Sequence, residues 1–161
     1  MKLRRLMIGA TCAAVAAAAL AGAWWLRALG PPPTGQSLVM SAQVVDRNGK
    51  LLRAYATPDG RWRLPVKVAD VDPRFIAMLL AYEDHRFREH HGVDPWAMAR
   101  ASIQLLSNGR VISGGSTLTM QVARLLEPRP DRTLAAKLFQ VARAIELERR
   151  LTKDQVLSLY L

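Results

Sequence analysis

A run of 21 residues without a charged side chain, residues 6–26, constrains this chain more than any other feature. A helix of about 20 apolar residues spans the hydrocarbon core of a bilayer. Three basic residues stand just before the run: Lys2, Arg4 and Arg5. Because basic flanks stay on the cytoplasmic side, the N-terminus is predicted to be cytoplasmic. The sequence thus predicts a cytoplasmic tail at 1–5 and a single-pass transmembrane anchor at 6–29.

A cleaved signal peptide is the alternative that this segment leaves open. Residues 21–23, Ala-Gly-Ala, resemble the small-residue site at which such peptides are cut. The apolar run is longer than the 7–15 residues typical of a signal peptide, which favours a retained anchor. In either case the rest of the chain is expected outside the cytoplasm. Residues 30–37, rich in proline and glycine, are predicted to form a short stiff linker.

The charge balance limits the classes of partner. The chain carries a formal net charge of +10, and from Asp46 onward it has 19 basic and 13 acidic residues. This excess favours anionic partners such as phospholipid head groups and phosphates. Nucleic acid is not expected, because no basic stripe with interleaved aromatic residues is present. The single cysteine, Cys12, excludes an intrachain disulfide.

Residues 38–161 predict a mainly α domain that opens with a short β-hairpin. The hairpin is expected over 39–56, with a two-residue turn at Asn48-Gly49, and a second turn is expected at 58–60. The longest helix after the anchor is predicted over 133–151. Other helix starts are marked by capping residues: Asp72 with Pro73, Asp94 with Pro95, Ser116 or Thr117, and Thr152 with Gln155.

Two adjacent carboxylates, Glu83 and Asp84, follow an apolar predicted helix and indicate acid–base chemistry. A solvated acidic helix end is the structural alternative. His90 is expected to be a polar neighbour of Glu83. His90, His91 and Asp94 could suggest a metal, but without cysteine or a second ligand cluster no metal-ligating residue is predicted.

A second segment, residues 114–121, reads Gly-Gly-Ser-Thr-Leu-Thr-Met-Gln. Its glycines permit close backbone approach, so N–H groups at a helix start could face a phosphate. The alternative is a helix cap with surface hydroxyls. Arg124, Lys137 and Arg143 follow, either as ordinary solvated charges or as cations that converge on a pyrophosphate.

Taken in order, these segments resemble the peptidoglycan glycosyltransferases, glycosyltransferase family 51, of class A penicillin-binding proteins. The residues that carry the first resemblance are Glu83, Asp84, Phe87, His90, Gly92 and Asp94. Residues 114–121 resemble the second family motif, Lys137 falls on the third, and residues 152–161 resemble the stretch that follows.

The resemblance implies an enzyme that polymerises lipid II into β-1,4 glycan strands for cell-wall synthesis. It implies a lysozyme-like lobe with a small membrane-dipping subdomain, located at the inner membrane on its periplasmic side. Lipid II and the growing glycan chain would be its substrates, with other cell-wall synthesis proteins as further partners. Glu83 would be the general base. Substrate-binding residues would be Asp84, Phe87 and His90 for the acceptor, and Ser116, Thr117, Gln121, Arg124, Lys137 and Gln140 on the donor side.

Several positions depart from the family pattern in the manner of its 1C-type members. Met120 replaces a glutamine, Ala136 an arginine, and Gln140 a second glutamate. Gln140 cannot bind a metal as a carboxylate does, which leaves use of a divalent cation such as Mg²⁺ open. The pattern also predicts that residues 38–161 are the N-terminal part of the domain, without its C-terminal part and without a transpeptidase domain.

Two other functions are considered beside this one. A truncated chain could act as a non-catalytic, membrane-anchored module that binds lipid II or a partner protein. Glycan hydrolysis is disfavoured, because an inverting hydrolase needs two carboxylates about 6.5–9.5 Å apart. Adjacent Glu83 and Asp84 are not expected to meet that requirement.

Overall fold

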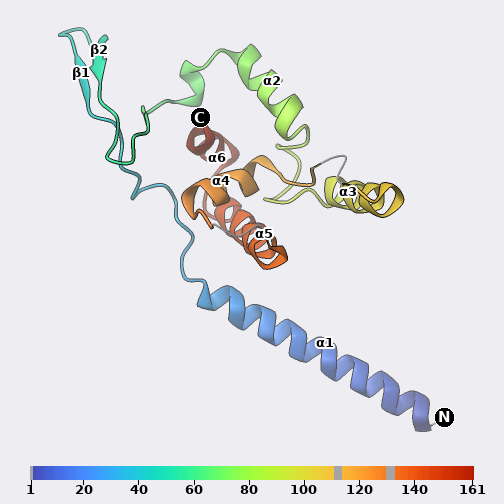
Figure 1. The fold of residues 1–161 in the computed structure, drawn as a ribbon. Coiled ribbons are helices and arrows are strands. Elements are labelled where there is room, and N and C mark those ends of the chain that lie inside the picture. The colour runs from blue at the N-terminus through green and yellow to red at the C-terminus, as the bar shows by residue number, and fades with distance from the viewer. Residues whose placement is uncertain (1, 111–113, 130–132) are drawn as a thin grey trace. The chain divides into compact units, whose positions relative to one another are not determined.

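A computed structural model describes residues 2–110, 114–129 and 133–161, and the chain divides into two units at Pro32 and Pro33. The first unit is helix α1, Lys2–Ala28 (Figure 1). Its segment Thr11–Ala28 has a mean hydropathy of 1.3, and none of it is buried. A helix of this length and composition suits a membrane span and a signal sequence alike, so the retained anchor stays a prediction.

The second unit, Pro33–Leu161, begins with the predicted hairpin. Strands β1, Gln43–Val45, and β2, Leu51–Ala54, are antiparallel, with Val44 opposite Arg53. The predicted two-residue turn is wrong. Asp46 and Lys50 are paired by a backbone hydrogen bond, so the loop is the three residues 47–49, and the Asp46 carboxylate accepts from the backbone N–H groups of Asn48 and Lys50. That side chain replaces the tight turn with a longer one.

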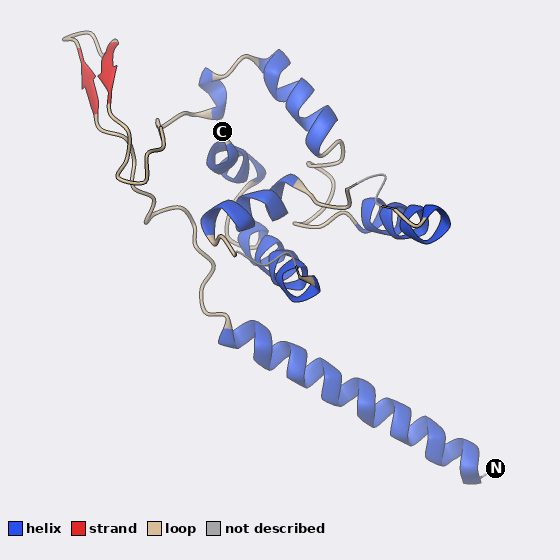
Figure 2. Ribbon diagram, viewed as in Figure 1, coloured by secondary structure: helices blue, strands red, loops and turns tan. Residues whose placement is uncertain are grey.

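Within the described residues, six helical segments follow the hairpin. Figure 2 shows helices as the bulk of the second unit. They are η1 Val68–Asp70, α2 Pro73–Glu83, α3 Pro95–Asn108, α4 Leu118–Leu126, α5 Leu134–Glu148 and α6 Lys153–Tyr160. The predicted caps are confirmed for α2, α3 and α6, and Thr117 rather than Ser116 caps α4. The mainly helical class with a short hairpin is therefore confirmed.

Helix α5 ends earlier than its apolar pattern predicts. The pattern extends to Leu151, but the helix ends at Glu148, where the backbone N–H of Arg150 bonds to the carbonyl of Leu147, three residues back, at 3.0 Å and tightens the last turn. Thr152 then begins α6 with a reciprocal capping box to Gln155. The capping box at the start of α6 therefore separates the two helices.

The core of the second unit is formed where α4 packs against α5 and α6. Its buried apolar side chains are Phe87, Leu118, Val122, Ala123, Leu147, Val156 and Leu157, and parts of η1 and α2 pack against them. All residues of helix α3 are described, and none of its side chains is buried. It leaves large apolar side chains in solvent, with Trp96 71% and Leu106 86% exposed.

Candidate active site

Glu83 is the last residue of α2, and it meets α4 through a side-chain hydrogen bond. The Gln121 amide Nε2 donates to Glu83 Oε2 at 2.8 Å. The two residues come from the first and second motifs, 38 positions apart in sequence. The Glu83 side chain remains partly exposed, so its carboxylate is both oriented by the protein and open to a ligand.

Asp84 turns away from that exposed position and into the protein. Its carboxylate accepts from the backbone N–H of Leu118 at 2.8 Å and lies 3.0 Å from His90 Nε2. A carboxylate at the start of α4 is stabilised by the partial positive charge of the helix N-terminus. His90 therefore pairs with Asp84, and its expected position beside Glu83 stays a prediction.

The loop between α2 and α3 is clamped at Gly92. Thr117 Oγ1 donates to the Gly92 carbonyl at 2.6 Å while it accepts from the N–H of Met120 as the cap of α4. Gly92 has a φ of +87°, and a Cβ there would lie 2.5 Å from the carbonyl oxygen of Ala144 in α5. Only glycine fits this conformation and this close approach.

Four of the predicted acceptor- and donor-side residues are thus buried. Asp84, Phe87, His90 and Thr117 have exposed fractions of 7%, 1%, 5% and 2%. Their contacts are to each other, to Gly92 and to the starts of α4 and α6, which suits residues that hold Glu83 and Ser116 in place.

The predicted donor side gathers two cations beside a hydroxyl. Lys137 of α5 donates from Nζ to Ser116 Oγ, which lies just before α4. Burial, and secondarily the nearby charge of Arg124, lower the pKa of Lys137 below its usual value. Gln140 is half-buried one turn further along α5. A hydroxyl, an ammonium and an exposed guanidinium are groups that bind an anion.

Arg143 does not belong to this cation group. Its side chain is 3% exposed and forms ion pairs with Glu127 at 2.7 Å and Glu146 at 2.8 Å. Its guanidinium also lies 5.2 Å from the centre of the Phe139 ring. These contacts tie α5 to the end of α4, so the interpretation of Arg143 as a pyrophosphate ligand is wrong.

A buried ion pair beneath the site was missed by the sequence reasoning. Glu148 accepts from Thr119 Oγ1 and pairs with Lys153 at 2.7 Å, and the Lys153 ammonium lies 4.5 Å from the centre of the Phe87 ring. Lys153 stands in the stretch that resembles the family, but no local pattern indicates its partners.

Tyr160 near the end of α6 was also missed. Burial first, and then the charge of Glu83, raise the pKa of Tyr160, while the charge of Arg124 opposes them. The charges of a carboxylate and of a cation of the candidate site therefore both act on Tyr160. Its spacing of 77 residues from Glu83 gave no signal in the sequence.

A metal centre is not formed by the predicted alternative ligands. Asp94 caps α3 and pairs with Arg86, and His91 is exposed, so neither joins the Asp84–His90 pair. Among the described residues no group of three histidine, cysteine or carboxylate side chains is placed to hold a metal ion.

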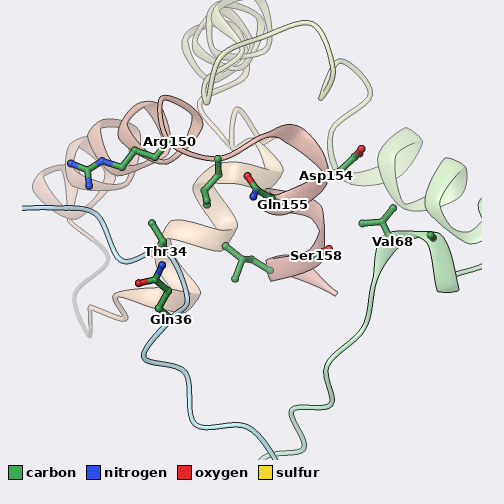
Figure 3. Close-up of a pocket in the computed structure, with 10 residues that line it drawn as sticks. Thr34, Gln36, Val68, Arg150, Asp154, Gln155 and Ser158 are labelled. Carbon is green, nitrogen blue, oxygen red and sulfur yellow. The ribbon is translucent and has the colours of Figure 1, made fainter. Parts of the chain in front are cut away.

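A large hollow among the described residues lies away from the candidate site residues. A cavity of about 760 Å³ is bounded by the linker, η1 and α6, and Figure 3 shows Gln36, Val68 and Ser158 around it. None of the predicted site residues lines it. The functional assignment therefore depends on the Glu83 and Lys137 groups and not on the size of a pocket.

Comparison with known proteins identifies the class of protein to which this chain belongs. A family model described as transglycosylase matches residues 48–161. Penicillin-binding protein 1C of Escherichia coli K12 is 52% identical over 118 residues, which cover 73% of this chain and 15% of the relative. Penicillin-binding protein 1A of the same organism is 40% identical over 124 residues, covering 77% and 14%. Penicillin-binding protein 1F of Bacillus subtilis is 36% identical over 121 residues, covering 75% and 16%.

This chain belongs to the transglycosylase family. Within it, the chain is similar to the 1C type of class A penicillin-binding proteins, which confirms the resemblance inferred from the motifs. It spans only about 14–16% of the length of these relatives.

Proposed function

We propose that this chain acts as a peptidoglycan glycosyltransferase that polymerises lipid II into β-1,4 glycan strands. The observation that carries the proposal is the contact between Glu83 and Gln121. It presents a partly exposed carboxylate on the same part of the molecule as the Ser116–Lys137 pair. A base and a cationic anion site are what this reaction requires.

Each side chain has a defined part in the proposed reaction. The Glu83 carboxylate removes the proton from the 4-hydroxyl of the acceptor sugar. The oxygen attacks the anomeric carbon of the donor, the bond to the lipid pyrophosphate breaks, and the carbon inverts to a β-linkage. Arg124, Lys137 and Ser116 stabilise the charge of the leaving pyrophosphate, with Gln140 beside them. Gln121 holds the carboxylate in its working orientation.

Asp84, Phe87, His90 and Thr117 act as positioning residues in this proposal. Their burial keeps them from the substrate, but their contacts fix Glu83 relative to the start of α4. The side chains around Lys137 do not suit a divalent cation well, because an amide replaces a carboxylate at Gln140. No step of the proposed reaction passes through a metal.

The proposed location is the inner membrane, with residues 38–161 on the periplasmic side as part of a lysozyme-like lobe. The basic residues before the apolar run of α1 support this orientation. Helix α3 supports a second membrane contact. It exposes Trp96, Ile103 and Leu106, and no acidic residue lies between Pro95 and Arg110. Such helices lie in the bilayer interface with their apolar side chains inserted.

Replacement of the base tests the proposal. Glu83→Gln keeps the size of the side chain but removes its capacity to take a proton, so the rate of polymerisation of labelled lipid II is expected to fall by about 10²–10⁴-fold. Glu89→Gln, at an exposed carboxylate on the following loop, is the matched control and is expected to retain activity. Undiminished polymerisation by a folded Glu83→Gln variant would exclude Glu83 as the base.

The alternative of a non-catalytic, lipid II-binding module is not favoured by membership of a transglycosylase family. It makes a different prediction in the same assay. A module without turnover would bind lipid II equally in the parent and Glu83→Gln chains, and neither would form polymer.

A further inference from the structure

We propose that the buried ion pair between Glu148 and Lys153 positions the Glu83 carboxylate of the candidate active site. The inference rests on the proposed function for its kinetic consequence, because it names two further positioning residues for that same reaction. Neither residue belongs to the predicted site, and both act through other side chains.

The ion pair lies where three helices meet. Glu148 is the last residue of α5, Lys153 is the first residue of α6, and their charged atoms are 2.7 Å apart. Thr119, in the first turn of α4, donates its hydroxyl to the same carboxylate. Only 4% of the Glu148 side chain and 19% of the Lys153 side chain are exposed. A buried pair adds little net stability over apolar side chains, but its charges must stay in contact, so it suits a role in placing these helices.

A chain of contacts leads from Lys153 to the backbone beside Glu83. The Lys153 ammonium lies 4.5 Å from the centre of the Phe87 ring. The Phe87 and His90 rings meet edge to face with their centres 6.3 Å apart, and His90 Nε2 lies 3.0 Å from the Asp84 carboxylate. Asp84 directly follows Glu83 and caps the end of α2. The ammonium therefore helps to hold the loop that fixes where α2 ends.

A second chain of contacts leads from Glu148 to the hydrogen-bond partner of Glu83. Thr119 joins Glu148 to α4, and Gln121 lies two residues further along that helix. The Gln121 amide donates to Glu83 Oε2 at 2.8 Å. The ion pair is thus connected to both sides of this hydrogen bond, to the segment that carries the carboxylate and to the helix that carries the donor. A shift of α4 against the loop would break the bond.

An exposed ion pair between the same two segments provides a comparison. Arg88, next to Phe87 in the loop, pairs with Asp154, next to Lys153 in α6, at 2.9 Å. Their side chains are 55% and 65% exposed, and exposed pairs contribute little because water screens them. The positioning role is therefore assigned to the buried pair and not to the exposed one.

Three variants of the detergent-solubilised full chain test the inference. Glu148→Gln with Lys153→Met removes both charges together, so no uncompensated charge stays buried and the fold should be retained. Lys153→Arg keeps a cation that can pair with Glu148 and stack on the Phe87 ring. Arg88→Gln with Asp154→Asn is the matched control, because it removes the exposed pair between the same segments. Circular dichroism verifies the fold of each variant.

The side-chain amide of Gln121 reports the geometry directly. Its signal in ¹⁵N-resolved NMR can be assigned by its loss in Gln121→Met. In the Glu148→Gln, Lys153→Met chain this signal is expected to move toward that of a glutamine side chain free in water, because the amide loses its bond to Glu83. In Lys153→Arg and in the exposed-pair variant it should stay where it is in the parent chain.

Turnover of lipid II supplies the kinetic measurement. Misplacement of the base slows the chemical step but leaves substrate binding intact, so the Glu148→Gln, Lys153→Met chain should lose about tenfold or more in kcat with KM unchanged. Lys153→Arg and the exposed-pair variant should keep the kcat of the parent. A pair that only stabilises the fold would leave both the Gln121 signal and the kcat of the folded chain unchanged. Either of those results, or an equal kcat loss in the exposed-pair variant, would overturn the inference.

The same data separate this inference from the proposed function. A displaced Gln121 signal in a chain whose parent polymerises no lipid II would support the positioning role and count against turnover. Normal polymerisation by the Glu148→Gln, Lys153→Met chain with an unmoved Gln121 signal would support the enzyme and overturn the positioning role.

Discussion

Glu83 and Asp84 are adjacent in sequence, yet their carboxylates differ in exposure and in hydrogen-bond partners. Glu83 closes α2 and remains partly exposed against Gln121. Asp84 is the C-cap of α2, with extended backbone that turns its side chain inward to the start of α4. Glu83 is therefore available to a ligand, whereas Asp84 fixes the end of α2 against the start of α4.

The lowered pKa of Lys137 allows a prediction about its protonation. Burial, and then the charge of Arg124, lower its pKa, so its ammonium should lose the proton at lower pH than an ordinary lysine. Arg124→Gln removes the second cause and should move the pKa upward, toward the usual 10.5. The measurement is NMR of isotope-labelled lysine side chains across the alkaline range. Arg100→Gln, on α3, is the control. If the pKa of Lys137 is the same in Arg124→Gln as in this control, the charge of Arg124 does not lower the pKa of Lys137.

The same shift has a defined sign for stability. In the pH window between the lowered pKa and 10.5, the unfolded chain binds more protons at Lys137 than the folded chain does. The contribution of Lys137 to the free energy of unfolding therefore rises with pH through that window. Loss of the ammonium over the same window removes a cation from the donor side, so activity should fall there while the fold is retained.

At the scale of elements, the N-terminus of α4 is where the candidate site is assembled. It receives the Asp84 carboxylate, carries the Thr117 cap, and through that cap holds the loop at Gly92. Gln121, one turn into the helix, then meets Glu83. A displacement of this loop would separate the carboxylate from its partner.

Gly92→Ala tests that assembly. An added Cβ would lie 2.5 Å from the Ala144 carbonyl oxygen at a φ of +87°, so a loss of about 3 kcal/mol or more in unfolding free energy is expected. Gly109→Ala is the control, because Gly109 also has a positive φ, +63°, but open space around it, and should cost only about 1–2 kcal/mol. Urea denaturation measures both. Equal losses in the two variants would show that the contact with α5 does not hold the loop.

Local sequence predicted the elements well and their mutual contacts poorly. Asp72, Asp94 and Thr152 cap helices with their own neighbours, so a short window contains the whole signal. The Asp84 carboxylate instead finds its backbone donor 34 residues away, and Lys153 lies over the distant ring of Phe87. Such partners depend on how the helices pack, which a single sequence does not specify.

The turn of the hairpin and the end of α5 show that local sequence patterns can also mispredict the bounds of an element. Asn48-Gly49 predicted a tight turn, but the Asp46 side chain bonds two backbone N–H groups and sets a longer loop. Apolar periodicity predicted α5 to Leu151, but the capping box at Thr152 required the helix to end first. In both cases a side chain that caps the backbone outweighed the broader pattern.

At the scale of the whole molecule, charge and exposed apolar surface point to the same partner. The residues after α1 carry 19 basic and 13 acidic side chains, an excess of six positive charges. Helix α3 exposes its large apolar side chains in the same unit. Anionic lipid head groups attract the excess positive charge, and the bilayer interface accommodates the exposed apolar side chains of α3. This unit should therefore bind a bilayer even without α1.

Vesicle binding by residues 33–161 checks this expectation. These residues contain the whole described core, and circular dichroism would verify their fold. Ile103→Asp with Leu106→Asp places two charges on α3 at positions 66% and 86% exposed, so it should spare the fold but weaken partitioning into phosphatidylglycerol vesicles at least about tenfold. Leu134→Asp, 77% exposed on α5, is the control. Added salt should weaken binding of all forms by screening the basic residues. Equal partitioning of the α3 variant and the control would mean that charge alone, without insertion of α3, brings this unit to the membrane.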